Sequence, residues 1–248
     1  MTTKIQIKNL RKVYDSTERK VHALEDVNLD VEDGEFLCLV GLSGCGKTTL
    51  LNILAGFVEI TAGTVAMDGK PLTEDYDKGV VFQEYALFPW RTARKNVEYG
   101  LEVRKVPAEK RKQIALDLLR LVRLGDFADF YPHNLSGGMR QRVAVARALA
   151  FDPQVLLMDE PFGALDAQTR EDLQELTVDV WQKTRKTVVY VTHNLSEAVY
   201  LGNRIVVFLP RPGRIREIVH VNLPRPRQAL SPEFVTIQQK LEDLIREP

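Results

Sequence analysis

The sequence predicts an α/β fold with a mainly parallel sheet into which a helical region is inserted. Three observations lead to this prediction. Residues 36–40 form a short, continuously apolar run that enters a glycine-rich loop, and apolar residues then recur at helical spacing. Residues 155–158 and 188–191 are further apolar runs, separated by a stretch with helical periodicity. Between about residues 94 and 150, apolar positions again follow helical spacing, which predicts a helical subdomain.

The composition is that of an ordinary globular protein, long enough for one large domain or one domain with a subdomain. The 248 residues include 34 Lys and Arg against 34 Asp and Glu, so the formal net charge is zero and we expect no nucleic-acid binding. No apolar run approaches the ~18–20 residues that span a bilayer, and the first residues alternate instead of forming a secretion signal. Cys38 and Cys45 lack metal-site spacing, which favours a reducing compartment such as the cytosol.

Strand patterns dominate the first third of the chain. Ile5, Ile7 and Leu10 are followed by alternating apolar and polar residues over 27–31, which is typical of a half-buried strand. After the glycine-rich loop and its helix, further short strands end in the apolar run at 80–82.

The elements after residue 150 alternate between strands and helices. A helix is predicted over about residues 167–183, between the two apolar strands, and another strand at 205–209. Several prolines follow, and an amphipathic helix is predicted over about 232–246.

Residues 41–48, Gly-Leu-Ser-Gly-Cys-Gly-Lys-Thr, fit the phosphate-loop pattern G-x-x-x-x-G-K-[ST] at every fixed position. Glycines let the backbone curl so that successive N–H groups point at phosphate oxygens, and the following helix presents its positive end to the same anion. We expect Lys47 to reach the β- and γ-phosphates of a nucleotide and the Thr48 hydroxyl to coordinate Mg²⁺. The candidate nucleotide-binding residues are Gly41, Ser43, Gly44, Cys45, Gly46, Lys47, Thr48 and Thr49.

Two carboxylates, Asp159 and Glu160, follow the apolar run at 155–158. A buried parallel strand delivers its last residues to the ligand crevice at the carboxyl edge of the sheet. Asp159 is therefore a candidate ligand for Mg²⁺, opposite Thr48. Glu160 is the next carboxylate and could polarise a water that attacks the γ-phosphate.

A phosphate loop alone leaves kinases, GTPases, helicases and transport ATPases open. A GTPase would normally carry an Asn-Lys-x-Asp motif, and the sequence contains no Asn-Lys pair. Residues 135–142, Leu-Ser-Gly-Gly-Met-Arg-Gln-Arg, place Ser136 at the expected start of a helix, which is a second anion-binding terminus. If each ATP is held between Lys47 of one copy and Ser136 of another, both cradles are explained and dimerisation becomes part of catalysis.

The order of these motifs resembles that of the ATP-binding-cassette (ABC) ATPases over nearly the whole chain. The resemblance implies a P-loop core with a mainly parallel sheet, an N-terminal antiparallel β subdomain and an inserted α-helical subdomain. It implies a single ABC domain, with residues 1–85 and 151–228 as the nucleotide-binding core and β subdomain, 86–150 as the helical signalling subdomain, and 229–248 as a C-terminal helix. The implied cofactors are ATP and Mg²⁺.

The same resemblance implies roles for residues around the nucleotide. Tyr14 resembles the aromatic residue that stacks on adenine. Gln83 resembles the glutamine that touches Mg²⁺ and the attacking water, and His193 resembles the switch histidine that contacts the γ-phosphate. The implied catalytic residues are Glu160, His193 and Gln83, and the implied metal ligands are Thr48, Gln83 and Asp159.

Other roles concern the partner copy. Ser136, Gly137 and Gly138 resemble the signature that closes over the partner's ATP, and Asp166 belongs to a segment that resembles the one communicating across the dimer. Two residues depart from the family pattern. Asn194 stands where Asp is common after the histidine, and Leu42 stands where Pro is common, but neither change removes a phosphate or metal contact.

Within the family, residues 159–166, Asp-Glu-Pro-Phe-Gly-Ala-Leu-Asp, resemble the form found in bacterial importer subunits. Shorter segments resemble the nitrate, sulfonate, taurine and bicarbonate importers: 87–90, 168–170, 210–214 and 223–227. The resemblance implies an ATP hydrolase whose ATP-driven dimer closure powers uptake of a small solute, such as one of these anions.

The resemblance also implies partners and a location. The partners are a second copy of the chain or a related ABC subunit, and separate transmembrane permease subunits that contact the region of Phe88 and Trp90. A periplasmic or lipid-anchored solute-binding protein would take part indirectly. The chain would be a peripheral protein on the cytoplasmic face of the plasma (inner) membrane.

Two other functions are weighed against transport. A soluble ABC ATPase without a permease, acting on ribosomes or DNA, usually carries two cassettes or a long coiled-coil insertion, and this sequence shows one cassette without a heptad tract. A nucleotide-binding regulator without turnover would lack a catalytic acid, whereas Glu160 is present. Co-purification with membrane proteins would separate transport from both alternatives.

Overall fold

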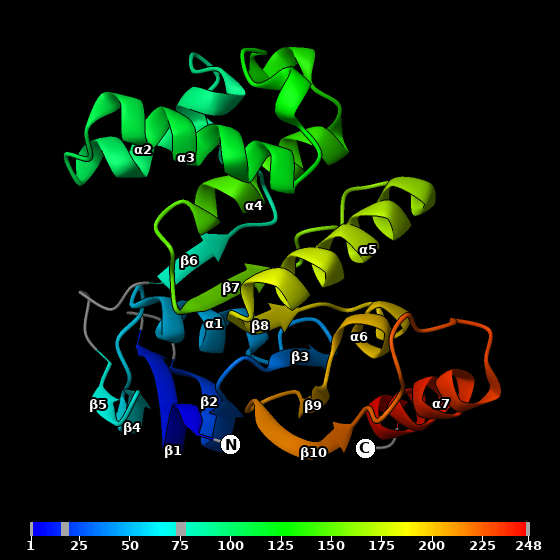
Figure 1. Ribbon diagram of the computed structural model, residues 1–248. Helices are drawn as coiled ribbons and strands as arrows, with labels where there is room; N and C mark the ends of the chain where they lie inside the picture. The colour runs from blue at the N-terminus through cyan, green and yellow to red at the C-terminus, as the bar shows by residue number, and fades with distance from the viewer. Residues whose placement is uncertain (1, 16–19, 73–77, 247–248) are drawn as a thin grey trace. The chain divides into compact units, whose positions relative to one another are not determined.

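The computed structural model describes residues 2–15, 20–72 and 78–246. The chain divides into two compact units. The first comprises Met1–Tyr76 and Thr187–Pro248, and the second comprises Asp77–Lys186. Figure 1 labels the helices and strands of each unit.

The first unit contains an antiparallel sheet in the strand order β2-β1-β4-β5. Ile5 and Ile7 lie opposite Val31 and Leu29, and all four side chains are buried, so the apolar positions of the alternating pattern share one face. This sheet confirms the expected N-terminal antiparallel region. Its strands are β1 (Thr3–Asp15), β2 (Lys20–Glu32), β4 (Ala62–Met67) and β5 (Lys70–Pro71).

A second group of strands in the first unit is mainly parallel. β3 lies between β8 and β9 and runs parallel to both, and β10 borders β9 in the antiparallel direction. Every residue of β3 and β8 is buried, as expected for parallel strands covered on both faces. These strands are β3 (Phe36–Gly41), β8 (Thr187–Val191), β9 (Arg204–Leu209) and β10 (Arg214–His220).

Three helices complete the first unit. α1 (Lys47–Ala55) follows β3 and ends at Gly56, whose left-handed backbone lets its N–H bond back to the last turn. α6 (Leu195–Leu201) follows β8, and α7 (Pro232–Arg246) packs against α6 and β9. Phe234 and Leu241 of α7 are buried. The sequence analysis predicted α7 but neither α6 nor β10.

The second unit contains two parallel strands and a largely helical region. β6 (Lys78–Val81) pairs with β7 (Val155–Asp159), with Val81 opposite Met158. α2, α3 and α4 pack against one another, which confirms the predicted helical region. The helices and 3₁₀ turns are α2 (Ala93–Val103), α3 (Ala108–Leu121), η1 (Gly125–Phe127), η2 (Pro132–Asn134), α4 (Gly137–Leu149) and α5 (Ala167–Thr184).

A buried carboxylate helps to hold the helical region together. The Glu98 side chain on α2 accepts hydrogen bonds from Arg94 and Lys95, each at 2.7 Å. Arg94 also pairs with Asp129 at 2.8 Å, so it links α2 to the segment before η2. Arg111 Nε lies 3.7 Å from Glu98 as well, so three cations accompany the buried Glu98 charge and compensate its burial.

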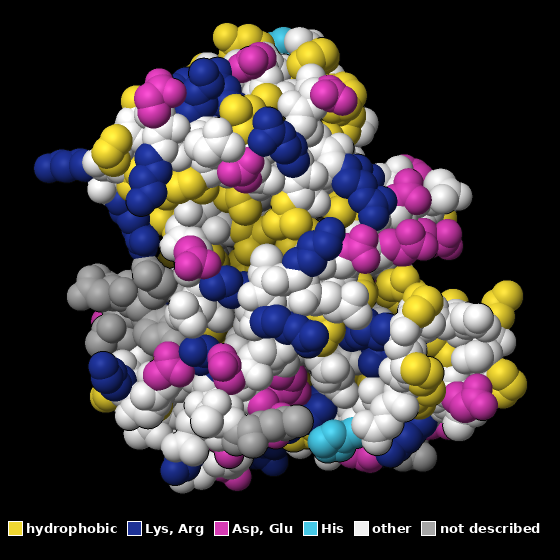
Figure 2. Space-filling view, in the orientation of Figure 1, with side chains coloured by type: hydrophobic (Ala, Val, Ile, Leu, Met, Phe, Trp, Pro, Cys, Tyr) yellow, Lys and Arg dark blue, Asp and Glu magenta, His cyan; other side chains and the backbone are white. Residues whose placement is uncertain are grey.

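The surface is charged but balanced. Figure 2 shows Lys and Arg side chains interspersed with Asp and Glu side chains on the face in view, in keeping with the zero formal net charge. None of the described helices combines the length and the apolar character that crossing a bilayer requires.

Candidate functional site

The phosphate loop lies between β3 and α1, in the first unit, where the sequence predicts it. Lys47 is the first residue of α1, and its side chain is buried inside the loop. Its Nζ donates to the carbonyl oxygen of Gly41 at 2.8 Å and to that of Leu42 at 3.1 Å. The Cys45 Sγ lies 3.5 Å from the same nitrogen. The loop therefore curls around a positive charge that its own carbonyls partly satisfy.

The start of α1 requires glycine at position 46. Gly46 is the N-cap residue and has a φ of 94°, a left-handed backbone that disfavours other residues. A Cβ at this position would lie 2.6 Å from Leu24 Cδ2 and 2.8 Å from the Ala23 carbonyl oxygen. Its N-cap residue, Gly46, has no side chain with which to cap α1, and a helix N-terminus is a favourable place for an anion. Thr48, in the first turn, is exposed.

His193 lies at the same edge of the parallel strands as the loop. Leu39 of β3 pairs with Val191 of β8, so the loop after Gly41 and the turn that carries His193 leave the sheet side by side. The His193 side chain is exposed, whereas the neighbouring Thr192 is buried. An exposed imidazole on a fixed turn can donate a hydrogen bond to a ligand held by the loop.

Tyr14 lies on β1, in the antiparallel sheet that also contains Leu24. It pairs with Val21 on β2, three residues before Leu24, whose side chain packs against Gly46. The Tyr14 side chain is 40% exposed, and Lys12 Nζ lies 4.8 Å from the centre of its ring. The exposed ring face is available for stacking on a planar group.

In the second unit, β6 and β7 bring Gln83 and Glu160 together. The two strands are parallel and end at the same edge, so Gln83 follows β6 where Asp159 and Glu160 end β7. A Cβ on Gly163 would lie 3.7 Å from Gln83 Nε2 and 3.8 Å from Glu160 Oε2, so both side chains face this glycine. Asp159 and Glu160 are half-buried. This cluster can hold a cation and accept a proton.

Two helix N-termini meet in the second unit. Ser136 caps α4, its hydroxyl accepting the N–H of Met139 at 3.2 Å. Asp166 caps α5, its carboxylate accepting the N–H of Thr169 at 3.0 Å. A Cβ on Gly138 would lie 2.5 Å from Thr169 Cγ2, so the first turn of α4 rests on the first turn of α5.

The N-terminal end of α4 is exposed and lies near the N-terminal end of α5. Ser136 and Asp166 are both exposed, and Gly137 adds no side chain that would cover the N–H groups of α4. The hydrogen bonds from Thr169 lower the pKa of the Asp166 carboxyl, so it stays ionised at neutral pH.

The segment between Gln83 and α2 is irregular but firmly held. Asn96, on α2, is fully buried. Its side chain accepts the Phe88 N–H at 2.8 Å and donates to the carbonyl oxygens of Phe88, Arg91 and Thr92. Arg147, on α4, donates to the carbonyl oxygens of Tyr85 and Ala86. Two side chains thus fix the backbone that carries Phe88 and Trp90, which belong to an aromatic cluster.

That aromatic cluster consists of Phe88, Trp90 and Tyr99. The Phe88 ring lies 5.7 Å from the Trp90 ring and 4.6 Å from the Tyr99 ring. Trp90 is 71% exposed, which is unusual for so large an apolar side chain. Arg91 stacks on the Tyr99 ring and pairs with Glu102 at 2.7 Å.

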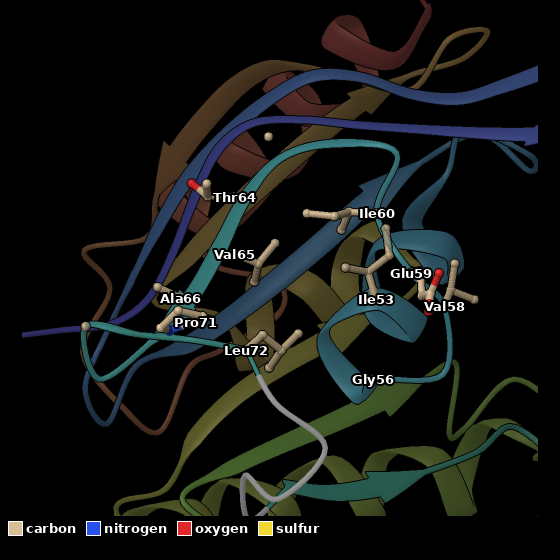
Figure 3. A pocket seen from close by; sticks show the side chains of 12 residues that line it. Ile53, Gly56, Val58, Glu59, Ile60, Thr64, Val65, Ala66, Pro71 and Leu72 are labelled. Atoms are coloured by element: carbon tan, nitrogen blue, oxygen red, sulfur yellow. The ribbon is translucent and has the colours of Figure 1, made fainter.

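An apolar hollow in the first unit lies away from the phosphate loop. Its volume is about 620 Å³, and its walls come from the carboxyl end of α1, from β4 and from Leu72 (Figure 3). Ile53 and Gly56 line it at one end of α1, whereas Lys47 begins the other end. Among the described residues of its walls, Glu59 is the charged one and most of the others are apolar or glycine, which does not suit phosphate chemistry.

The structure adds residues that the sequence analysis did not assign. Gly213, in the turn before β10, donates its N–H to the Ala23 carbonyl oxygen, and its own carbonyl oxygen accepts the Glu25 N–H. A Cβ there would collide with the Cys45 carbonyl oxygen, so Gly213 lies directly against the phosphate loop. Only the glycine within the proline-rich stretch 210–214 could have suggested such a contact.

The comparisons with known proteins agree on the kind of protein. The family described as ABC transporter matches residues 24–163. The uncharacterized ABC transporter ATP-binding protein MJ0412 of Methanocaldococcus jannaschii is 50% identical over 248 residues, which cover 100% of this chain and 93% of that protein.

Two further relatives carry names that refer to import. The nitrate import ATP-binding protein NrtD of Synechocystis sp. is 42% identical, over 98% of this chain and 95% of that protein. The taurine import ATP-binding protein TauB of Rhizobium johnstonii is 45% identical, over 92% of this chain and 90% of that protein. A solved dimer of the ATP-binding cassette MJ0796 bound to ADP and Pi is 36% identical, with a TM-score of 0.77, and covers 89% of this chain and 100% of that chain.

Proposed function

Because the chain belongs to the ABC transporter family and is one of its ATP-hydrolysing transport ATPases, we propose that it powers the import of a small anion through separate permease subunits. The observation that carries the ATPase part of this proposal is the presence of two helix N-termini suited to an anion, α1 after the phosphate loop and α4 at Ser136. The relatives named for import support the transport part. One nucleotide needs one such phosphate loop, and a second terminus serves a nucleotide bound by another copy.

Lys47 and the N-terminus of α1 are proposed to bind the phosphates of ATP. Lys47 would exchange its bonds to the loop carbonyls for bonds to the β- and γ-phosphates. The proposed nucleotide-binding residues of the loop are Gly41, Ser43, Gly44, Cys45, Gly46, Lys47, Thr48 and Thr49. Tyr14 would stack on the adenine.

Mg²⁺ is proposed as the metal that Thr48, Asp159 and Gln83 would hold. The Thr48 hydroxyl, the Asp159 carboxylate and the Gln83 amide are all oxygen ligands, which Mg²⁺ prefers together with phosphate oxygens and water. All three side chains are at least partly exposed, as a site shared with a nucleotide requires. When bound, Mg²⁺ would neutralise charge on the phosphates.

Glu160, Gln83 and His193 are proposed as the catalytic residues. Glu160 would accept a proton from the water that attacks the γ-phosphate, and Gln83, which faces the same glycine, would orient that water. His193 would donate a hydrogen bond to the γ-phosphate from the edge of β8. Positioning and charge stabilisation would carry the rate, since phosphoryl transfer to water needs no covalent intermediate.

A second copy of the chain, or a related ABC subunit, would complete each site. Ser136, Gly137 and Gly138 would bind the γ-phosphate of the partner's ATP, and Asp166 would lie at the dimer interface. The similarity to the dimeric cassette bound to ADP and Pi supports this arrangement. ATP binding would then close the dimer, and hydrolysis would reopen it.

The aromatic cluster of Phe88, Trp90 and Tyr99 is proposed as the contact with the permease. Exposed aromatic rings on a fixed backbone are typical of the energetic centre of an interface. Arg147 joins this segment to α4, which begins at Ser136. Movement of the permease contact and of the signature would therefore be mechanically linked.

In this proposal the chain acts as one ABC domain. Residues 1–85 and 151–228 form the core with the β subdomain, 86–150 the helical signalling subdomain, and 229–248 the C-terminal helix. The chain would lie on the cytoplasmic face of the plasma (inner) membrane, with a solute-binding protein acting through the permease. Nitrate, sulfonate, taurine and bicarbonate are the proposed class of solute, supported by the relatives named for nitrate and taurine import.

Affinity purification of the full chain from detergent-solubilised membranes tests the transport function. We expect a multi-span membrane protein to co-purify, and W90A to reduce its yield at least about tenfold because a central aromatic contact is lost. The matched control, F130A, removes an exposed aromatic side chain outside the cluster and should leave the yield unchanged. Recovery of the chain with ribosomes or DNA, and without membrane proteins, would contradict the proposal.

A further inference from the structure

The helix that begins directly after His193 is short and is held at both ends. α6 has seven residues, Leu195–Leu201. A helix of two turns gains little stability from its own hydrogen bonds, so its position depends on the groups that hold its ends. His193 directly precedes Asn194, the N-cap residue of this helix.

The N-terminal end of α6 is held by three polar side chains. The Thr192 hydroxyl donates to a carboxylate oxygen of Glu197 at 2.5 Å and accepts the N–H of Asn194 at 3.0 Å. The Asn194 side chain caps the helix by accepting the N–H of Glu197 at 3.1 Å. The residues on both sides of His193 are thus fixed, while its imidazole stays exposed.

The C-terminal end of α6 is held by two arginines from the segment after β10. Arg227 Nη1 donates to three carbonyl oxygens, those of Val199 (2.7 Å), Tyr200 (3.1 Å) and Gly202 (2.6 Å). Arg225 donates to the carbonyl oxygens of Tyr200 (3.0 Å) and Leu201. The two guanidinium groups therefore satisfy carbonyls that a helix end normally leaves to water.

The same arginines anchor this end of the helix to the rest of the unit. Arg227 Nη2 also donates to the Val221 carbonyl oxygen at 3.1 Å. Gly202 lies against β3, since a Cβ there would sit 3.1 Å from Cys38 Sγ. The end of α6 is consequently fixed between β3, which leads into the phosphate loop, and the segment that carries Arg225 and Arg227.

Burying a cation here has an energetic cost. The Arg227 side chain is 7% exposed, and burial, followed by repulsion from Arg225, lowers its pKa to about 10. The negative end of the α6 dipole and the planar donors of guanidinium offset this cost. The C-cap residue of α6 is Gly202, whose φ of −75° is extended and does not form the left-handed glycine cap, so the two arginines bind the last carbonyl oxygens instead.

We propose that Arg225 and Arg227 are positioning residues for ATP hydrolysis, which hold α6 so that His193 keeps its orientation toward the γ-phosphate. The inference rests on the proposed role of His193 and identifies the groups that set its geometry. Arg227 contributes most because it is the more buried and binds both ends of the Val199–Gly202 turn.

A double-mutant cycle in the full chain tests this proposal. We expect R227Q to lower kcat about fivefold or more, with KM for ATP changed less than about twofold, because the phosphate loop is untouched. In the H193A background, R227Q should lower kcat less than about twofold further, because the group it positions is gone. Arg225 is half-buried. We expect R225Q to lower kcat less than R227Q does, and to lower it less in the H193A background than in the parent chain.

The matched control, R246Q, removes an exposed arginine of α7 in the same unit and should leave kcat unchanged. Equal losses from R227Q or R225Q in both backgrounds would show a purely structural role and would overturn the proposal. If R227Q prevents folding, R227K, which keeps the charge but loses the planar fork, completes the cycle. An H193A chain with undiminished kcat would instead contradict the proposed role of His193. That result differs from equal losses of kcat in the two backgrounds, which would contradict only the role of the arginines.

Discussion

Lys47 Nζ donates a hydrogen bond to the carbonyl oxygen of Gly41 at 2.8 Å, so the phosphate loop closes on its own lysine. The same nitrogen lies 3.1 Å from the Leu42 carbonyl oxygen. The lysine is thus already held within the loop, and in the proposed function phosphate oxygens would replace these carbonyls.

We expect K47A to raise the Kd for ATP by about 30- to 100-fold, since charge-assisted bonds to two phosphates are lost. Titration of the full chain with ATP by calorimetry measures this change. K110A, which removes an exposed lysine of α3, is the matched control and should bind ATP normally. Unchanged affinity in K47A would contradict the role assigned to the loop.

We expect E160Q to lower kcat for ATP hydrolysis by about 10²- to 10³-fold, because glutamine cannot accept the proton of the attacking water. ATP affinity should change little, since Glu160 follows the strand and is not part of the phosphate loop. Phosphate release measures the rate, with E175Q, an exposed carboxylate of α5, as the control. Ordinary turnover in E160Q would remove this residue from its role.

The packing of α2 makes a prediction about stability. A Cβ on Gly100 would collide with the ring of Phe151, so the helix approaches this ring only because position 100 is glycine. We expect G100A to lower the free energy of unfolding by about 1–3 kcal/mol, against the small gain that alanine brings to an open helix. Urea unfolding measures it, and adding F151L should restore part of the loss. A stabilised G100A chain would show that the ring moves freely.

Local motifs made much of the site predictable from sequence. The phosphate loop, Asp159, Glu160 and the Ser136 cap each depend on a few neighbouring residues, and the buried strands appear as apolar runs. α6 was missed because seven residues are too few for a periodic pattern, although Asn194 followed by Glu197 is a capping signal.

The remaining features depend on contacts between distant segments. β10 was missed because most of its residues are only half-buried and its apolar pattern is weak. The approach of Gly213 to the phosphate loop brings together residues 23, 45 and 213. Arg225 and Arg227 bind carbonyl oxygens of α6 that precede them by more than twenty residues in the sequence. Such contacts follow from the folded backbone and leave little trace in local spacing.

The account depends most on the sharing of each ATP between two copies, with Lys47 on one and Ser136 on the other. Sedimentation of the E160Q chain with ATP and Mg²⁺ tests this most directly, because the nucleotide is retained. We predict a dimer with ATP and a monomer with ADP, and S136R in the same background should bind ATP yet remain monomeric. An E160Q chain that stays monomeric at saturating ATP, or an S136R chain that dimerises as well as its parent, would contradict it.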